Sequence, residues 1–373
     1  PGGVMADEIL TEGKGQLRGL FVTGGNPLIT MANAQRLRGA FSKLELLVCL
    51  DIHESETASL AHYVLPCTSP FQRPDLPFIF PLMLGLQSKP YLQATKRLVR
   101  PTGEQLDEAT IYTLLAKHSG VGLFGSKVLQ KALELSMRFY AKKHPDELPQ
   151  VQQEGVLNII LRATGQQGFD ALLKHPHGWE RKGHVAQNFL GKRVVTDDGR
   201  VHLAPAPLLA QAAKLEGDFA LEKTMEGKLK LITKRAITTH NSWTHNFDEF
   251  VRGDNDTNYL YMNPEDAERL SLANGDVADV TSRTGTVRVP VRVLAELMPG
   301  TCALPHGWGH QFAKGQSVAS RTSGVNVNIL AADGPDQIEK LTGMAHLTGI
   351  PVDVKRASGP RETRSWSGIA SEI

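Results

Sequence analysis

The chain has 373 residues, and its 41 lysines and arginines nearly balance 39 aspartates and glutamates. This length allows two or three domains with real cores, and the balanced charge excludes the basic excess of a nucleic-acid-binding protein. Three isolated cysteines, Cys49, Cys67 and Cys302, argue against disulfides and against a cysteine-held metal centre. No apolar run approaches the roughly 20 residues that span a bilayer, and no signal-peptide pattern opens the chain. We therefore expect a cytoplasmic protein without a membrane span.

Residues 17–66 have the pattern of an α/β unit. Strands are predicted at 17–22, at 46–50 ending in Asp51, and at 63–65. A helix from about Pro27 to Leu44 and a second, short helix separate them. The first helix is predicted to have one apolar face, made of Leu37, Ala40, Phe41 and Leu44. Strands that alternate with helices predict a parallel, Rossmann-like sheet wound in the right-handed sense.

The middle of the chain is predicted to be mostly helical. Prolines interspersed with apolar residues predict an irregular loop at 69–90, and helical spacing of apolar residues predicts helices at 107–118, 127–143 and 156–163. Residues 175–227, rich in glycine, proline and histidine, are interpreted as a connection between domains.

After Gly227 the pattern becomes that of short strands and tight turns. Strands are predicted at 228–233, 277–282 and 287–294, with a brief helix capped by Asn263 and a hairpin turn at 282–286. These features favour a compact β-barrel. We predict a cofactor-binding domain at 1–145, a connection at 146–227 and a barrel domain at 228–373.

The first strand runs into Gly24, Gly25, Asn26 and Pro27. Glycine allows positive φ and close approach of a ligand, while Asn and Pro suit the start of a helix. Free amide groups at such a junction favour an anion such as phosphate. An ordinary turn is the alternative interpretation.

The aspartate after the second strand is a further candidate. In dinucleotide folds an acid at the position of Asp51 accepts hydrogen bonds from ribose hydroxyls or from guanine. A helix cap is the plainer interpretation. Ser55 or Thr57 can cap the short helix that follows, and the close spacing of His53, Glu54 and Glu56 disfavours a metal site.

Two loops combine histidine with tryptophan, at residues 240–246 and 305–310. Histidine and asparagine can recognise a flat heterocycle through hydrogen bonds, and tryptophan adds an apolar wall. Buried loop histidines are the alternative, and zinc fits poorly because a third ligand is lacking. A third cluster at 320–328 could bind phosphate or hold a loop.

The order of these motifs resembles the C-terminal half of the molybdopterin oxidoreductase family. The resemblance rests on GGNP, on the run from Leu44 to Pro66, on NSWTHN at 241–246, on 263–285 and on HGWGH at 306–310. His62 stands where the family usually has aspartate. The resemblance implies that the barrel is of the double-psi type.

The resemblance also implies a set of residues that bind molybdopterin guanine dinucleotide. Asp51 would read guanine, and the barrel loops would approach the pterins and diphosphates. The implied set is Gly25, Asn26, Pro27, Asp51, Ser55, Glu56, Thr57, His240, Asn241, Ser242, His306, Gly307 and Asn326.

The implied function is that of the cofactor-binding portion of a molybdenum- or tungsten-dependent oxidoreductase. The metal ligand and an iron-sulfur cluster would lie in an N-terminal half absent from this sequence, and electron-transfer subunits are expected partners. A non-catalytic module that binds a guanine dinucleotide remains the alternative. An NAD-dependent dehydrogenase is disfavoured because GxGxxG is lacking.

Overall fold

The computed structural model describes residues 1–77, 91–180, 194, 196–236 and 241–358. The chain forms two compact units, one of Pro1–Val64 with Ala204–Ile373 and the other of Leu65–Leu203. The limits predicted from the sequence, at 145 and 227, differ from these. The first unit joins the two ends of the chain through long-range contacts, which local sequence patterns do not reveal.

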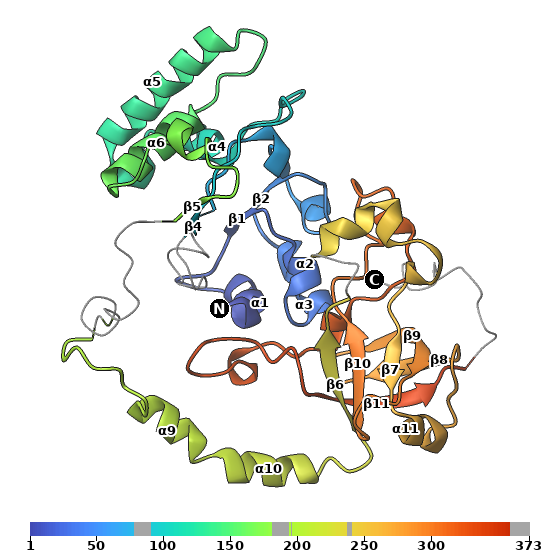
Figure 1. The fold of residues 1–373 in the computed structure, drawn as a ribbon. Coiled ribbons are helices and arrows are strands. Elements are labelled where there is room, and N and C mark those ends of the chain that lie inside the picture. The colour runs from blue at the N-terminus through green and yellow to red at the C-terminus, as the bar shows by residue number, and fades with distance from the viewer. Residues whose placement is uncertain (78–90, 181–193, 195, 237–240, 359–373) are drawn as a thin grey trace. The chain divides into compact units, whose positions relative to one another are not determined.

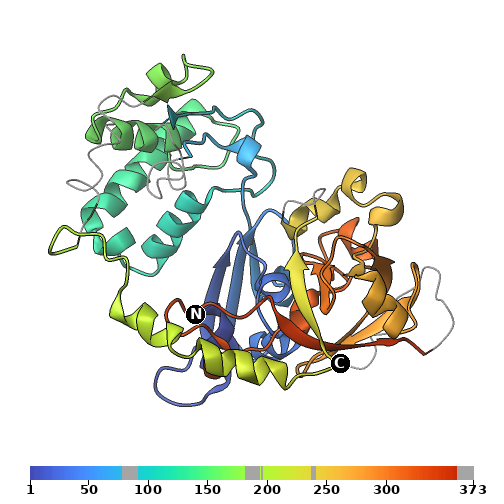
Figure 2. The same ribbon diagram turned by 60° about the horizontal axis from the view of Figure 1, so that its bottom comes forward.

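The first unit contains a small parallel sheet, drawn in blue in Figures 1 and 2. Its strands are β1 (Gly19–Thr23), β2 (Leu46–Asp51) and β3 (Tyr63–Pro66), in the order β1-β2-β3. The first unit ends within β3, after Val64. β1 and β2 pair in parallel from Gly19↔Leu46 to Thr23↔Leu50. Leu47 to Leu50 are all buried because β2 is the central strand. The predicted strands and the parallel sheet are confirmed.

The single helix predicted from Pro27 to Leu44 is wrong. The structure has α2 (Pro27–Thr30) and α3 (Ala34–Phe41), preceded in the chain by α1 (Met5–Leu10). Asn33 breaks the helix with φ 49°, and its side chain caps α3 by accepting a hydrogen bond from Arg36 N. The predicted apolar face is confirmed, because Leu37, Ala40 and Phe41 are at most 1% exposed.

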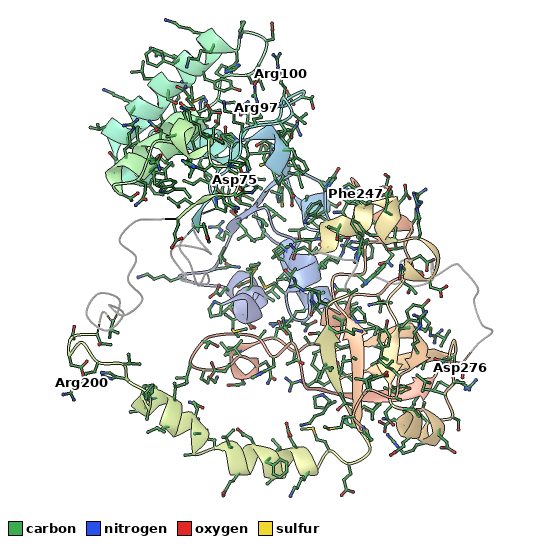
Figure 3. The ribbon with its side chains drawn as sticks, in the orientation of Figure 1. Asp75, Arg97, Arg100, Arg200, Phe247 and Asp276 are labelled. Carbon is green, nitrogen blue, oxygen red and sulfur yellow. The ribbon has the colours of Figure 1, made fainter. Side chains whose placement is uncertain are left out.

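The second unit is mainly helical. It contains α4 (Glu108–His118), α5 (Lys127–Lys143), α6 (Gln153–Ala163) and α7 (Phe169–Leu172), with a two-stranded sheet of β4 (Tyr91–Leu92) and β5 (Trp179–Glu180). The three helices predicted in this region are confirmed. Arg97, labelled in Figure 3, bonds to Glu147 at 2.6 Å and to Tyr140 at 2.8 Å. Part of the loop predicted at 69–90 lies outside the described residues.

Part of the connection predicted at 175–227 is helical, and residues 181–193 and 195 lie outside the described residues. It contains α9 (Ala206–Ala212) and α10 (Leu215–Lys223), and neither helix buries a residue. None of the helices that the structure describes is both long and apolar enough to cross a membrane.

The last part of the first unit is a closed six-stranded barrel. Its strands are β6 (Leu229–Lys234), β7 (Leu260–Met262), β8 (Val277–Thr281), β9 (Thr286–Val293), β10 (Thr301–Pro305) and β11 (Ile350–Arg356). They close in the order β10-β6-β11-β8-β9-β7, with parallel pairs β6/β10 and β7/β9. The predicted barrel is confirmed, although β7, β10 and β11 were not predicted. A short helix, α11 (Pro264–Arg269), begins at the predicted cap, Asn263.

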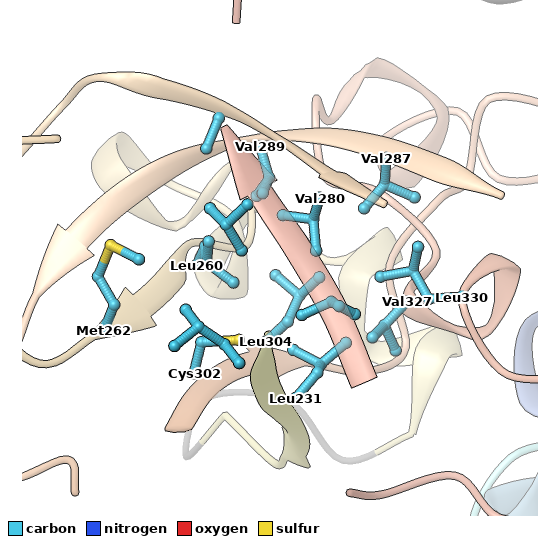
Figure 4. Packing of buried hydrophobic residues seen from close by; sticks show 14 of the residues in the cluster. Leu231, Leu260, Met262, Val280, Val287, Val289, Cys302, Leu304, Val327 and Leu330 are labelled. Carbon is cyan, nitrogen blue, oxygen red and sulfur yellow. The ribbon is translucent and has the colours of Figure 1, made fainter. Parts of the chain in front are cut away.

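Alternating apolar residues fill the barrel (Figure 4). In β9, Val287, Val289 and Val291 point inward and are at most 2% exposed, as the period of two predicts. Leu231 and Val280 meet them from other strands at 0% exposure. Burial of each such side chain contributes about 1.5–3 kcal/mol, so the barrel is a stable base for the loops that leave it.

Candidate functional site

The turn after β1 lies at the carboxyl edge of the parallel sheet. Gly24 has φ +56°, and its amide donates to Leu50 O at 2.8 Å. A Cβ added to Gly24 would meet no atom within 4 Å, so the backbone is open to a ligand there. The helix that follows, α2, has only four residues, and its dipole is correspondingly small.

Asp51 ends β2 at the same edge of the sheet. The two strands run parallel, so Gly24 and Asp51 both follow the carboxyl ends of their strands. The carboxylate Oδ1 accepts a hydrogen bond from Ile52 N at 2.7 Å. Burial raises the pKa of Cys49 to about 12, and the charge of Asp51 adds to this shift.

The side chain of Asn26 does not cap a helix, contrary to expectation. Its Nδ2 donates to Glu56 Oε2 at 2.5 Å, and its Oδ1 accepts from Thr57 Oγ1 at 2.8 Å. Thr57 Oγ1 in turn accepts from Leu28 N at 3.2 Å. Asn26, Glu56 and Thr57 are 9%, 2% and 0% exposed. Both ends of the amide therefore tie the turn after β1 to the segment after β2.

Glu56 extends this network to two histidines from the barrel loops. Glu56 Oε1 lies 2.8 Å from His310 Nδ1, and His310 Nε2 lies 2.9 Å from His245 Nδ1. Both histidines are 0% exposed. The ring of His245 stacks on Trp308, with centroids 4.0 Å apart. His245 belongs to the 3-10 segment η7 (Ser242–Asn246), while Trp308 and His310 follow β10.

The loop after β10 needs its two glycines. Gly307 has φ +90° and Gly309 has φ +104°, in the region that other residues rarely adopt. A Cβ on Gly309 would stand 2.8 Å from Asn326 N. The glycines thus allow Trp308 and His310 to turn inward while the loop packs against the segment around Asn326.

Two asparagines join this segment to α2. Asn326 Nδ2 donates to Leu28 O at 2.8 Å, and Asn328 Nδ2 donates to Ile29 O at 2.6 Å. These bonds occupy carbonyl oxygens that the four-residue helix leaves without partners. The turn after β1 is therefore held by both the sheet and the barrel loops.

Burial favours the neutral form of two histidines of the barrel loops, His245 and His306. Burial lowers the pKa of His245 to about 3, helped by His310 and His306 and opposed by the Gly307 backbone. Burial also lowers the pKa of His306, with a smaller contribution from Arg235. Arg38, on α3, has its pKa lowered by burial, although the charge of Glu56 opposes the shift. Neutral imidazoles act as hydrogen-bonding groups here rather than as cations.

The predicted site residues that the structure describes all lie in the first unit of the chain. Gly25, Asn26, Pro27 and Asp51 follow β1 and β2, and Ser55, Glu56 and Thr57 form the buried segment next to them. Of the barrel residues, Ser242, Gly307 and Asn326 lie in the loops that reach this network, and His306 is half-buried. Asn241 is exposed, with φ 63°, and His240 lies outside the described residues. Their binding roles remain predictions.

The sequence analysis missed the residues that link the network. His245, Trp308 and His310 were noticed in their motifs, but only the first histidine of each loop was chosen as a site residue. Their common signal was weak: each stands next to a small or polar residue in a loop with a second histidine. Only the pairing of Glu56 with His310 makes their position recognisable.

Two cavities lie elsewhere, in the second unit. One, of about 760 Å³, is lined by Phe71, Lys96 and Asp170 among others, and one of about 190 Å³ lies near Arg97 and Tyr140. Neither shares a residue with the network around Glu56. We place the candidate site at the network because its polar groups are buried and convergent, whereas size alone favours the cavities.

Two family models match the chain. The model described as "Molybdopterin oxidoreductase" matches residues 3–117, and the model described as "Molydopterin dinucleotide binding domain" matches residues 229–347. The first match includes the parallel sheet. The second includes five of the six barrel strands and ends before β11.

Curated relatives agree with these matches. An F420-dependent formate dehydrogenase subunit alpha of Methanocaldococcus jannaschii is 24% identical over 81% of this chain and 40% of its own. A trimethylamine-N-oxide reductase of Haemophilus influenzae is 24% identical over 88% of this chain and 42% of its own. The chain thus spans about two fifths of the length of these relatives.

A solved structure has a similar fold. Acetylene hydratase from Pelobacter acetylenicus matches 95% of this chain and 46% of its own, with a TM-score of 0.66 and 19% identity. At this identity the likeness concerns the fold.

Proposed function

Because this chain belongs to the molybdopterin oxidoreductase family, we propose that it is the C-terminal portion that binds molybdopterin guanine dinucleotide in a molybdenum- or tungsten-dependent oxidoreductase. In such an enzyme the bound metal exchanges two electrons with the substrate, by oxygen-atom or hydride transfer. The part of this chain is to bind and orient the pterins and to supply hydrogen bonds to them.

One observation carries the proposal: the buried network contains polar groups without partners. His245 Nε2 and Trp308 Nε1 are buried and have no hydrogen-bond partner among the described residues. Buried polar groups in native proteins are nearly always paired. A flat heterocycle with ring nitrogens and N-H groups offers the partners that an imidazole and an indole need. The residues of the network therefore fit a pterin.

The residues divide into those that contact the cofactor and those that hold the site. Asp51, at the open edge of the sheet, is proposed to accept hydrogen bonds from guanine, and the backbone at Gly25 to approach the phosphates. The side chains of Asn26, Glu56 and Thr57 already bond to one another, so they are proposed to position the turn. The barrel-side residues complete the proposed site: His240, Asn241, Ser242, His306, Gly307 and Asn326.

Nucleotide titration tests the role of Asp51. We expect calorimetry on the full-length, cofactor-free protein to show tighter binding of GDP than of ADP or NADH, because adenine lacks the N1-H that a carboxylate accepts. Asp51→Asn should weaken GDP binding by about 10- to 100-fold, as expected for a hydrogen bond to a charged group. Asp336→Asn, at a side chain 93% exposed, serves as the matched control. Tighter binding of NADH than of GDP contradicts the assignment.

The metal and its partners are proposed from the longer relatives. Those relatives are more than twice as long as the matched part, so we propose that the metal ligand and an iron-sulfur cluster belong to regions with no counterpart here. Three relatives are named as alpha subunits of formate dehydrogenases, which supports electron-transfer subunits as partners. Elemental analysis of the anaerobically purified full-length protein should find molybdenum or tungsten. The absence of both would sink the redox function.

We further propose that the barrel is of the double-psi type. The strand pairing supports this, because two parallel pairs, β6/β10 and β7/β9, lie within an otherwise antiparallel barrel. An experimental structure that traces the crossings between these strands decides the point.

A further inference from the structure

Three ionisable side chains form an unbroken buried chain in the first unit. Glu56 comes from the segment after β2, His310 from the loop after β10, and His245 from η7. Their contacts measure 2.8 Å and 2.9 Å, and the residues are 2%, 0% and 0% exposed. Such a chain can transmit a proton because each imidazole ring has two nitrogens. One nitrogen can accept a proton while the other releases one.

The hydrogen-bond partners assign the protons of the resting chain. An ionised Glu56 only accepts hydrogen bonds, so His310 Nδ1 carries a proton. In the neutral His310 ring, Nε2 then carries no proton and accepts a hydrogen bond from His245 Nδ1. The single ring proton of His245 is therefore on Nδ1. His245 Nε2 is left with a lone pair, and it is buried without a hydrogen-bond partner among the described residues.

We propose that Glu56, His310 and His245 form a proton relay that takes up one proton at His245 Nε2 and holds it on His310 against Glu56. In the step, a donor N-H or O-H bond breaks and an N-H bond forms at His245 Nε2. The Nδ1-H bond of His245 breaks as an N-H bond forms at His310 Nε2, and the electron pair stays on the donor. His245 begins and ends neutral with its tautomer exchanged.

The surroundings explain why the charge rests on His310. Glu56 lies 2.8 Å from His310, so an imidazolium there is paired with a carboxylate that Asn26 also holds in place. Among the described residues no acid lies beside His245, whose ring faces Trp308, His310, His306 and the Gly307 backbone. Burial, followed by His310, lowers the pKa of His245 to about 3. Arg38 on α3 is the further charged group that acts on Glu56.

The ligand chemistry follows from the open end of the relay. In the resting state His245 Nε2 accepts a hydrogen bond, so it selects a ligand N-H or O-H group. After proton uptake the same atom is a donor, so the ligand group that lost its proton still has a partner. The three residues of the relay belong to this chain, so proton uptake can be followed without a cofactor, with hydronium from the solvent as the O-H donor.

Nitrogen NMR tests the relay directly. The full-length protein, labelled with ¹⁵N-histidine and free of cofactor, is titrated from about pH 8 to pH 5 while long-range ¹H-¹⁵N correlations report each ring. His245→Gln and His310→Gln assign the signals, and His306→Gln identifies a nearby histidine outside the relay. We expect His310 to gain a second N-H as His245 moves its single proton from Nδ1 to Nε2, both at one midpoint.

Variants separate a relay from a structural cross-link. Glu56→Gln removes the carboxylate that holds the proton and should abolish the coupled change, while Glu54→Gln should leave it in place. The wild-type titration is decisive even where Glu56→Gln fails to fold. Unchanged tautomers over the whole range, or a His245 ring that gains a second proton by itself, overturn the proposal. These outcomes are independent of nucleotide binding, so the relay and the proposed function can fail separately.

Discussion

Glu56 and His310 are 254 residues apart in the chain, yet Glu56 Oε1 and His310 Nδ1 lie 2.8 Å apart in its interior. Their contact joins the segment after β2 to the loop after β10. The same carboxylate accepts a hydrogen bond from Asn26, in the turn after β1. Glu56 is therefore the point at which the sheet and the barrel loops of the first unit are bonded together.

Removal of the Glu56 carboxylate should destabilise the first unit strongly. In Glu56→Ala, Asn26 Nδ2 and His310 Nδ1 lose their acceptor in a site with no access to water, and we expect a loss of about 3–5 kcal/mol in the free energy of unfolding. Urea denaturation measures it. Glu54→Gln, two residues away and only half-buried, should change stability by less than about 0.5 kcal/mol. Equal effects of the two changes would refute the role assigned to Glu56.

Stability should depend on pH through His245. Its folded-state pKa of about 3 lies below its ordinary value of 6.5, so the unfolded chain binds the proton first as the pH falls. The stabilisation from neutral His245 is present above about pH 6.5 and is lost toward pH 3, with a slope of up to ~1.4 kcal/mol per pH unit. His245→Gln should flatten this slope in denaturation curves at pH 7, 6 and 5. A variant with the parent's slope would contradict the prediction.

Gly309→Ala should destabilise the protein by more than the positive φ at this position alone explains. The new Cβ would stand 2.8 Å from Asn326 N, on a backbone with φ +104°. Gly300→Ala is the matched control, because Gly300 has φ +81° but its added Cβ would meet no atom within 4 Å. We expect about 1–2 kcal/mol for the control and at least ~2 kcal/mol more for Gly309→Ala. Thermal unfolding of both variants compares them, and equal losses would show that the close approach to Asn326 is relaxed freely.

Arg36 should contribute far more to stability than a surface arginine. It bonds to Asp7 and to Asp333, each at 2.6 Å, and the Asp333 side chain is only 8% exposed. Arg36→Gln leaves both carboxylates without their cation, so we expect a loss of about 2–3 kcal/mol. Arg18→Gln breaks the Arg18–Glu45 pair, whose side chains are 65% and 60% exposed, and should cost at most about 1 kcal/mol. Urea denaturation of both variants, without guanidinium and at low and high salt, compares the two losses in stability.

Local patterns predicted the elements whose residues repeat with a clear period. The alternation Val287, Val289, Val291 predicted β9, and the spacing of Leu37, Ala40 and Phe41 predicted the buried face of α3. The break between α2 and α3 was missed because it depends on Asn33, whose side chain also donates to Asp333, 300 residues away. Strands β7, β10 and β11 were missed because they pair within the barrel with segments distant in sequence.

The sequence by itself determined the parallel sheet, the barrel class and the family, because each depends on periodicity, turn residues or the order of motifs along the chain. Only the tertiary structure decided which polar residues work together. Asn26 was expected to cap a helix but bonds to Glu56, and the second histidines of the two loops, His245 and His310, complete the buried chain. Hydrogen bonds between side chains form over a few ångströms in space, and contacts between residues hundreds of positions apart leave no local pattern in a single sequence.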